Sequence, residues 1–286
     1  MNIIDGKQIA AALKGDVAAR VAAAVASHGR APQLVVIRVG EDPASVVYVR
    51  NKEKACEAVG IRNTTIVKEA DTPEEELLGL IRQLNEDPSV DGILVQLPLP
   101  KPLSEARVIE TIAREKDVDG FHPLNVAGLW QKTPHMNPCT PAGIMKLLEA
   151  VGVDPKGKRA VVIGRSTIVG LPVAKMLLDA NATVTLCHTR TQNLPEVTRQ
   201  AQILVVAAGR AKMVTADMVS PGTVVIDVGM DRDPETGALC GDVDFDAVSP
   251  KALAITPVPG GVGPMTIACL MENTVRCFLN RMAAGQ

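Results

Sequence analysis

The segment AVVIGRSTIVGLP, residues 160–172, constrains the fold of this chain more than any other segment. An apolar, β-branched run ends at Gly164, and a helix is predicted to begin near Ile168. In such a strand–turn–helix unit, the free N–H groups and the positive dipole end of the helix face a phosphate. Only Gly164 and Gly170 of the usual G-x-G-x-x-G pattern are present. The segment therefore indicates a dinucleotide site, but with an incomplete fingerprint.

The next predicted strand, 182–187, indicates which dinucleotide is bound. It ends about 20 residues after the glycine turn, where an NAD enzyme places an Asp or Glu on the ribose 2′-hydroxyl. The residues that follow it are His188, Thr189, Arg190 and Thr191, and none of them is acidic. Arg165 and Ser166 lie in the turn itself, where they can meet a 2′-phosphate. The sequence therefore favours NADP over NAD.

Composition excludes several other classes of protein. A net charge of −2 gives no field for nucleic acid, and no Lys/Arg cluster suits an anionic membrane surface. No apolar run approaches the ~20 residues of a membrane helix, and Asp5 among the first apolar residues argues against a signal peptide. The six cysteines form no C-x-x-C pair and the four histidines lack ligand spacing. We therefore expect reduced thiols, no metal and a cytoplasmic enzyme.

Two α/β patterns follow one another along the 286 residues. The first has strands at 34–39, 61–67 and 92–97, with helices at 43–59 and 73–85 that open with Asp42-Pro43 and Thr72-Pro73. The second has strands near 160–164, 182–187, 203–207, 223–228 and 253–256. This alternation predicts parallel strands joined by right-handed crossovers.

The expected architecture is therefore α/β, with two α/β domains flanking a cleft. Pro134 to Pro141 is the expected joint between domain 1–139 and domain 140–265. The second domain is expected to be a Rossmann-type, doubly wound parallel sheet that binds NADP. The last helix, within 266–286, is expected to pack back on the first domain.

Tyr48 and Lys52 lie four residues apart, on one face of the helix that begins after Asp42. Spacing alone is also compatible with a surface lysine beside a half-buried tyrosine. The alternative is that Lys52 acts as an acid–base or electrostatic group, while Tyr48 forms a flat wall for a ring-shaped substrate. Burial disfavours the ammonium form, so such a lysine can be tuned toward neutral pH.

Two further segments carry candidate polar groups. Gln96 ends an apolar strand before Pro98 and Pro100, at the sheet edge where parallel sheets bind ligands; it is equally compatible with a capping amide in a turn. Residues 116–120, KDVDG, are typical of a turn. A buried carboxylate there would also bind the N–H edge of a heterocycle.

The loop 256–266, TPVPGGVGPMT, is rich in glycine and proline, and we interpret it as a ligand-facing loop. Asp242, Asp244 and Asp246 resemble the opening of a calcium loop, but Ala247 and Leu253 stand where Gly and Glu are required, so that interpretation is rejected. Ser45 and Ser166 lack a His and Asp constellation for nucleophilic catalysis.

Taken together, these segments resemble the bifunctional methylenetetrahydrofolate dehydrogenase/methenyltetrahydrofolate cyclohydrolase family. The resemblance covers nearly the whole chain, with its motifs in order. They are SVVYVRNK (45–52), GI (60–61), VQLPLP (95–100), KDVDGFHPLN (116–125), PCTPAG (138–143), VIGRS (162–166), IVGLP (168–172), VIDVG (225–229), GDVD (241–244) and PVPGGVGPMT (257–266).

The resemblance implies oxidation of 5,10-methylenetetrahydrofolate with NADP, and then hydrolysis of the methenyl product to 10-formyltetrahydrofolate. It implies catalytic roles for Lys52, Gln96, Tyr48 and Asp119: Tyr48 stacks on the folate pterin, Asp119 holds its amino-pyrimidine edge, and Lys52, tuned by Gln96, serves the hydrolysis. The remaining implied residues are Ser45, Pro259, Gly260 and Gly261 for the folate, and Gly164, Arg165, Ser166, Thr189 and Met230 for NADP. Met230 and Thr189 stand where the family more often has Ile and Ser or Arg.

The family also implies a cytoplasmic homodimer in one-carbon metabolism that serves purine and amino-acid biosynthesis. Three alternatives stay open. One is an NADP-dependent dehydrogenase of the shikimate type, without hydrolase activity. The others are a monofunctional dehydrogenase of the same family, and a cofactor-binding regulator with a decayed catalytic cleft.

Overall fold

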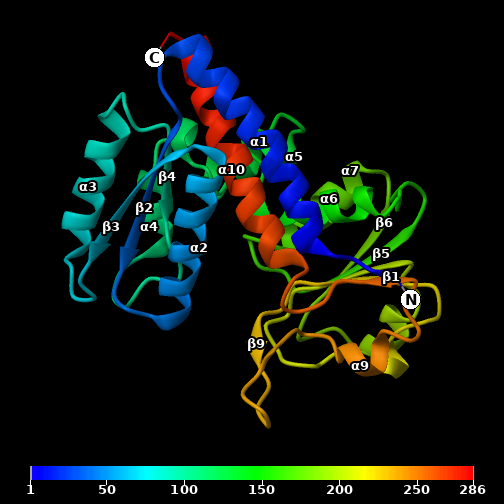
Figure 1. Cartoon of the computed structure of the whole chain (residues 1–286). Helices are drawn as coiled ribbons and strands as arrows, with labels where there is room; N and C mark the ends of the chain where they lie inside the picture. Colours follow the sequence, from blue (N-terminus) through cyan, green and yellow to red (C-terminus); the bar gives the residue numbers. More distant parts are fainter. Residues whose placement is uncertain (1, 286) are drawn as a thin grey trace. The chain divides into compact units, whose positions relative to one another are not determined.

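The computed structural model describes residues 2–285 and divides into two compact units (Figure 1). The six-stranded unit comprises the residues up to Ala10 together with Thr140–Thr266. The three-stranded unit comprises Ala11–Cys139 and the residues from Ile267 onward. None of the helices within residues 2–285 is long and apolar enough to cross a membrane.

The three-stranded unit is built on a parallel sheet in the order β3-β2-β4. Its strands are β2 (Gln33–Val39), β3 (Arg62–Lys68) and β4 (Gly92–Val95), and its connecting helices are α2 (Pro43–Val59) and α3 (Glu74–Glu86). Helices α4 (Glu105–Thr111) and α5 (Pro123–Trp130) follow, with a 3₁₀ turn, η1 (Arg114–Lys116), between them. Strand β2 is buried along most of its length, as expected for the centre of a parallel sheet.

The predicted boundaries in this unit lie within one residue of the structure except at the end of β4, and the predicted cap of α3 is wrong. Strand β4 ends at Val95 rather than at residue 97, because Pro98 and Pro100 have no N–H group with which to continue the ladder. Helix α2 is capped as predicted, since Ser45 N donates to Asp42 Oδ2 at 2.8 Å. Thr72 does not cap α3: its hydroxyl donates to the Glu69 carbonyl at 2.7 Å, and the helix begins after Pro73.

The six-stranded unit is a fully parallel sheet in the order β1-β11-β8-β7-β5-β6. Its strands are β1 (Asn2–Ile3), β5 (Arg159–Ile163), β6 (Thr183–Cys187), β7 (Ile203–Val206), β8 (Val224–Asp227) and β11 (Ala254–Ile255). Helices α6 (Cys139–Ala150), α7 (Gly170–Asp179), α8 (Leu194–Thr198) and α9 (Phe245–Val248), the 3₁₀ turn η2 (Ala216–Met218) and the hairpin β9 (Asp231–Arg232)–β10 (Leu239–Cys240) complete it. The order reverses beside β5, which gives the doubly wound arrangement expected from the sequence.

The N-terminal residues differ from the expected division. Residues 1–139 were assigned to the first domain, but β1 pairs in parallel with β11, so Asn2 and Ile3 extend the six-stranded sheet. Ile4 N also donates to the Ile255 carbonyl at 2.9 Å. A strand of two residues carries no alternating pattern, which is why its partner sheet cannot be predicted from the sequence.

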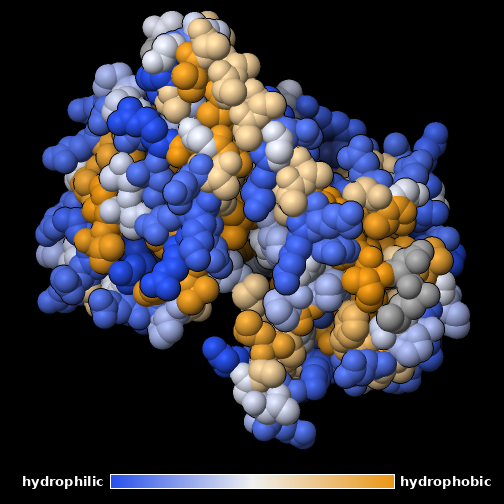
Figure 2. Space-filling model, viewed as in Figure 1, coloured by the Kyte–Doolittle hydropathy of each residue, from blue (hydrophilic) through white to orange (hydrophobic). Residues whose placement is uncertain are grey.

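Two long helices, α1 (Gly6–His28) and α10 (Val262–Ala283), begin in the six-stranded unit and continue into the three-stranded unit. In the latter they lie side by side, with an Arg20–Glu272 ion pair and an edge contact between His28 and Phe278 (Figure 1). Helix α1 has no predicted counterpart, because alanines lie on its exposed and buried sides alike and leave no apolar period; Figure 2 shows a pale orange band where this helix faces the viewer. Alanine nevertheless has the highest helix propensity.

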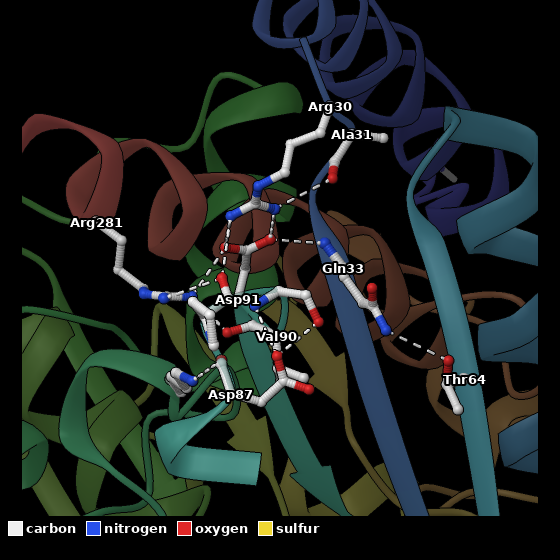
Figure 3. A network of polar contacts seen from close by, with 11 residues as sticks. Arg30, Ala31, Gln33, Thr64, Asp87, Val90, Asp91 and Arg281 are labelled. Atoms are coloured by element: carbon white, nitrogen blue, oxygen red, sulfur yellow. Dashed lines mark hydrogen bonds and ion pairs between the residues drawn. The ribbon is translucent and has the colours of Figure 1, made fainter. Parts of the chain in front are cut away.

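An ion network holds α10 in the three-stranded unit (Figure 3). Asp91, fully buried just before β4, accepts two bonds from the Arg30 guanidinium, one from Gln33 N at 2.9 Å and one from Arg281 at 3.0 Å. Arg281 lies in the last turn of α10 and also donates to the Val90 carbonyl. Both arginines therefore converge on one carboxylate.

Candidate active site

Lys52 is buried, only 7% exposed, on the inner face of α2. Its Nζ donates to Gln96 Oε1 at 2.8 Å, and Gln96 Nε2 donates to the Leu97 carbonyl at 2.7 Å. The interpretation of Lys52 as a surface residue is therefore wrong. The Gln96 amide nitrogen makes a hydrogen bond within the turn after β4, as a capping amide does, while its amide oxygen accepts from Lys52. Gln96 therefore connects the end of β4 with α2.

Burial lowers the pKa of Lys52, while the charge of Asp119 raises it. The pKa of Asp119 is raised to about 6, because the carboxyl is desolvated and Asp117 adds negative charge nearby, whereas Lys52 acts in the opposite direction. A lysine with a lowered pKa beside a carboxyl with a raised pKa is a pair suited to proton transfer near neutral pH.

The turn that carries Asp119 is held by its neighbour Asp117. This buried carboxylate accepts bonds from Gly120 N at 3.0 Å, His122 N at 2.8 Å and Asn125 Nδ2 at 2.8 Å. Residues 116–120 therefore form a turn, as predicted, and Asp117 stabilises it. Asp119 itself lines a small cavity with Asp117 and apolar side chains from β4, α4 and the adjoining loops.

Tyr48 lies one turn before Lys52 on α2, half-buried, and burial raises its pKa. Ser45 is buried in the first turn of the same helix, where its backbone N–H bonds the capping Asp42. The three-stranded unit thus brings together Tyr48, Lys52, Gln96 and Asp119 and places Ser45 at the start of the same helix. Pro259, Gly260 and Gly261 belong to the six-stranded unit.

In the six-stranded unit, the glycine turn after β5 is tightly packed. Gly164 has φ of 116°, and a Cβ on it would overlap the carbonyl oxygen of Ala207, which follows β7. A Cβ on Gly170, the first residue of α7, would overlap the Gly164 carbonyl. Only glycine fits at these two positions, so the turn packs closely against the end of β7, at the strand-order reversal where doubly wound sheets bind dinucleotides.

Helix α7 begins at Gly170, two residues later than predicted, because Ser166 organises the turn before it. Ser166 Oγ accepts bonds from Val169 N at 3.2 Å and Gly170 N at 3.3 Å. A hydroxyl has two acceptor lone pairs and one donor, so its proton remains for an anionic ligand. Arg165, Ser166 and Thr189 are all exposed, and the ends of β5 and β6 are joined by a Gly164 N to Cys187 O bond of 2.9 Å.

Two aspartates that the sequence did not mark as functional shape the same edge of the sheet. Asp242 is fully buried and accepts bonds from Ala208 N at 2.6 Å, Gly209 N at 3.1 Å and Arg210 N at 2.7 Å. Asp227, at the end of β8, accepts from the backbone N–H groups of residues 229, 242 and 243. Desolvation raises the pKa of Asp227 to about 7.

The remaining candidates lie in loops of the six-stranded unit. Met230 is 44% exposed just after Gly229, and a Cβ on Gly263 would lie 3.3 Å from its Cε atom. Gly260 has φ of 113° and its carbonyl accepts from Lys7 N at 3.1 Å. A Cβ on Gly261 would lie 2.7 Å from the Pro257 carbonyl oxygen, so the loop has no room there for a side chain. Asp244, from the rejected calcium pattern, caps α9 by accepting from Ala247 N.

Sequence reasoning missed Cys139 and Asn273 as well as the two aspartates. Cys139 is buried, burial raises the pKa of its thiol well above the ordinary value, and the thiol lowers the pKa of the neighbouring Asp119 carboxyl. Asn273 on α10 contacts Cys139 Sγ at 3.4 Å. Cys139, Asp227 and Asp242 lie in motifs quoted above, but their contacts, like those of Asn273, are made with segments that are distant in the chain.

Both halves of the chain match one protein family. Residues 4–119 match the catalytic domain of the tetrahydrofolate dehydrogenase/cyclohydrolase family, and residues 138–282 match its NAD(P)-binding domain. A relative named bifunctional protein FolD, from Streptococcus pneumoniae serotype 4, is 58% identical over 281 residues, 98% of each chain. One from Acidiphilium cryptum is 57% identical over 274 residues, 96% of each chain.

Solved structures agree with the sequence comparisons. The bifunctional methylenetetrahydrofolate dehydrogenase/cyclohydrolase of Campylobacter jejuni superposes with a TM-score of 0.95 at 49% identity, over 98% of this chain and 99% of that one. The Trypanosoma brucei dehydrogenase–cyclohydrolase, solved with NADP and an inhibitor, gives 0.94 at 39% identity, over 98% of both chains. Shikimate dehydrogenase of Aquifex aeolicus gives only 0.54 at 15% identity over 89% of this chain and 93% of that one, a likeness of fold alone.

The fold and the site define a two-unit α/β enzyme with an NAD(P)-binding domain. More specifically, the chain belongs to the tetrahydrofolate dehydrogenase/cyclohydrolase family, with matches to both of that family's domains. The family assignment confirms the resemblance inferred from the sequence motifs and replaces the shikimate-type alternative.

Proposed function

We propose that this protein oxidises 5,10-methylenetetrahydrofolate with NADP and then hydrolyses the methenyl product to 10-formyltetrahydrofolate, with Lys52 as the group that handles protons in the second step. The observation that carries the proposal is the buried Lys52–Gln96 bond of 2.8 Å beside Asp119, in a chain that matches both domains of the family.

In the first reaction the protein's main task is positioning. The substrate carbon lies between two nitrogens, and a nitrogen lone pair assists departure of the hydride, so no strong acid or base is needed. NADP supplies the hydride acceptor. Tyr48 stacks on the pterin and Asp119 accepts bonds from its amino-pyrimidine edge, which fixes the carbon that loses the hydride.

The second reaction needs proton transfer. Water adds to the methenyl carbon and loses one proton; the bond from that carbon to N5 then breaks as the hydroxyl proton passes to N5, which leaves the formyl group on N10. A buried lysine with a lowered pKa has a neutral fraction that can accept the water's proton. Gln96 accepts a hydrogen bond from Lys52 Nζ and so holds it in one orientation.

Three features support NADP over NAD. No acidic residue follows β6 between His188 and Thr191. Arg165 is an exposed cation in the glycine turn, where it can pair with a 2′-phosphate. Ser166 keeps a hydroxyl proton to donate. The turn around Gly164 and Gly170 lies where doubly wound sheets bind a dinucleotide, and Thr189 and the Met230 backbone complete the proposed contacts.

The cellular setting is proposed from the family resemblance: a cytoplasmic homodimer whose product serves purine and amino-acid biosynthesis. The six cysteines support a reducing compartment, since all are free thiols and five are buried. The folate is the small-molecule partner, and neither nucleic acid nor membrane is proposed as one.

A spectrophotometric assay tests the function. The enzyme is given 5,10-methylenetetrahydrofolate with NADP and, separately, with NAD, and acid quenching separates the overlapping methenyl and NADPH absorbances. Decay of added methenyltetrahydrofolate reports the hydrolase. Reduction of NADP with accelerated methenyl decay is expected. Reduction of NAD alone would overturn the cofactor assignment, and inactivity in all three assays would overturn the function.

A further inference from the structure

Asn273 on α10 joins two loops of the three-stranded unit through one amide group. The side chain is 95% buried, with a relative exposure of 5%. Its Nδ2 donates to the Val118 carbonyl at 2.8 Å and to the Asn137 carbonyl at 2.9 Å, and lies 3.4 Å from Cys139 Sγ. An amide nitrogen has two hydrogens, so the two carbonyls engage both of them.

Two of these contacts, those with Val118 and Cys139, lead to Asp119. The Val118 carbonyl belongs to the peptide group that continues into Asp119, so its position fixes where the Asp119 side chain begins. Cys139 Sγ donates to the same carbonyl at 3.3 Å, and its thiol lowers the pKa of the neighbouring Asp119 carboxyl. On the other side of the turn, Asp117 binds Gly120 N and His122 N. Asp119 therefore lies between two sets of hydrogen bonds, one made by Asp117 and the other by Asn273.

The neighbouring residue on α10 provides a contrast. Thr274 is also fully buried, but its hydroxyl donates to the Leu270 carbonyl of its own helix at 2.8 Å. A side chain that served only to stabilise α10 would need no bonds to other loops. Asn273 instead directs its donors to the segments around residues 118 and 137–139.

We propose that Asn273 is a positioning residue for folate binding, which fixes the Asp119 carboxyl against the amino-pyrimidine edge of the substrate. This inference rests on the proposed role of Asp119. It also gives α10 a role in the site, because Asn273 on this last helix donates a hydrogen bond to the Val118 carbonyl of the turn.

The test is the steady-state kinetics of Asn273→Leu, in which the side chain has nearly the same shape but no donor, with Thr274→Val as the matched control. Loss of hydrogen bonds that position a binding group reduces affinity rather than the rate of the bound complex. We expect the KM for methylenetetrahydrofolate to rise about tenfold, a change of about 1.4 kcal/mol. We expect kcat, per folded enzyme, and the KM for NADP to stay within about threefold of wild type.

Thr274→Val is expected to leave both KM values unchanged. If Asn273→Leu does not fold, Asn273→Ser is measured in the same way. A wild-type folate KM in the soluble variant, with only the amount of active enzyme reduced, would overturn the inference, because it would show a purely structural role. Failure of the proposed function would be seen separately, as a wild-type enzyme without folate turnover.

Discussion

At the scale of single residues, the chemistry depends on how burial acts on two opposite charges. Desolvation lowers the pKa of Lys52 and raises that of Asp119 to about 6, whereas their mutual attraction counteracts both shifts. Each group is thereby brought closer to neutrality than it would be in water. The Gln96 amide binds Lys52 Nζ without adding a charge, so it orients the amine while leaving the effect of burial in place.

Folate affinity is predicted to depend on the protonation of Asp119. With a pKa of about 6, the group is a carboxylate above that pH and a neutral acid below it, and only the carboxylate accepts both bonds from an amino-pyrimidine edge. The KM for methenyltetrahydrofolate should therefore rise as the pH falls from 6 to 5. Asp119→Asn should give a high KM at every pH; if its pH dependence matched that of the wild type, Asp119 would not be the titrating group.

The residues that the sequence identified share one property: each lies in a motif with its own local meaning. Tyr48 and Lys52 stand four apart on a helix, and Gln96 ends an apolar strand. Asn273 lies in no such motif, and its partners lie 134 to 155 residues earlier in the chain. Burial of Lys52 was likewise not predictable, since i,i+4 spacing is the same for a surface lysine.

At the scale of elements, two buried aspartates fix the loops at one edge of the six-stranded sheet by accepting hydrogen bonds from their backbone N–H groups. Asp242 gathers three consecutive N–H groups of the loop after β7, and Asp227 gathers N–H groups from the loop after β8 and from residues 242–243. Parallel sheets bind dinucleotides at this edge. These aspartates therefore fix the loops that border the proposed NADP site.

Asp242→Asn is predicted to weaken NADP binding, because its NH₂ group would face at least one of the three N–H donors and would displace the loop. We expect the KM for NADP to rise about tenfold, which corresponds to the loss of one such hydrogen bond. Decay of methenyltetrahydrofolate, measured without NADP, should be nearly unchanged. The control is Asp244→Asn, which makes the same change in charge but keeps a good N-cap for α9. Equal effects of the two substitutions would contradict the role of Asp242.

Most elements could be predicted because the strands are apolar runs and the helices start at recognisable caps. The failures have physical causes. Helix α1 lacks an apolar period, β1 is too short to show one, and α7 is delayed because Ser166 caps the turn before Gly170. The aspartates at 227 and 242 were visible in the sequence, but which N–H groups they bind is decided by the packing of distant loops.

At the scale of the whole molecule, one buried ion network ties the two ends of the three-stranded unit. Asp91 is bound by Arg30, just after α1, and by Arg281, near the end of α10 (Figure 3). Arg281 is buried as well, at 5% exposure, so removal of its partner would leave a cation without compensation in the interior.

Asp91→Ala is therefore predicted to lower the free energy of unfolding by about 3–5 kcal/mol, the range for breaking a buried ion pair. Urea denaturation followed by circular dichroism measures this change. The control is Arg107→Met, which breaks the pairs that the exposed Arg107 makes with Glu74 and Glu75 and should leave stability almost unchanged. A similar small effect for both variants would show that the Asp91 network does not stabilise the unit.

The central claim is that one chain carries two reactions that differ in their need for Lys52. The decisive measurement is Lys52→Met, assayed in parallel for oxidation of methylenetetrahydrofolate and for hydrolysis of methenyltetrahydrofolate, with exposed Lys54→Met as control. We expect hydrolysis to fall at least about 100-fold, the lower range for loss of an acid–base group, while oxidation falls less and methenyltetrahydrofolate accumulates. Hydrolysis at the wild-type rate would contradict the account.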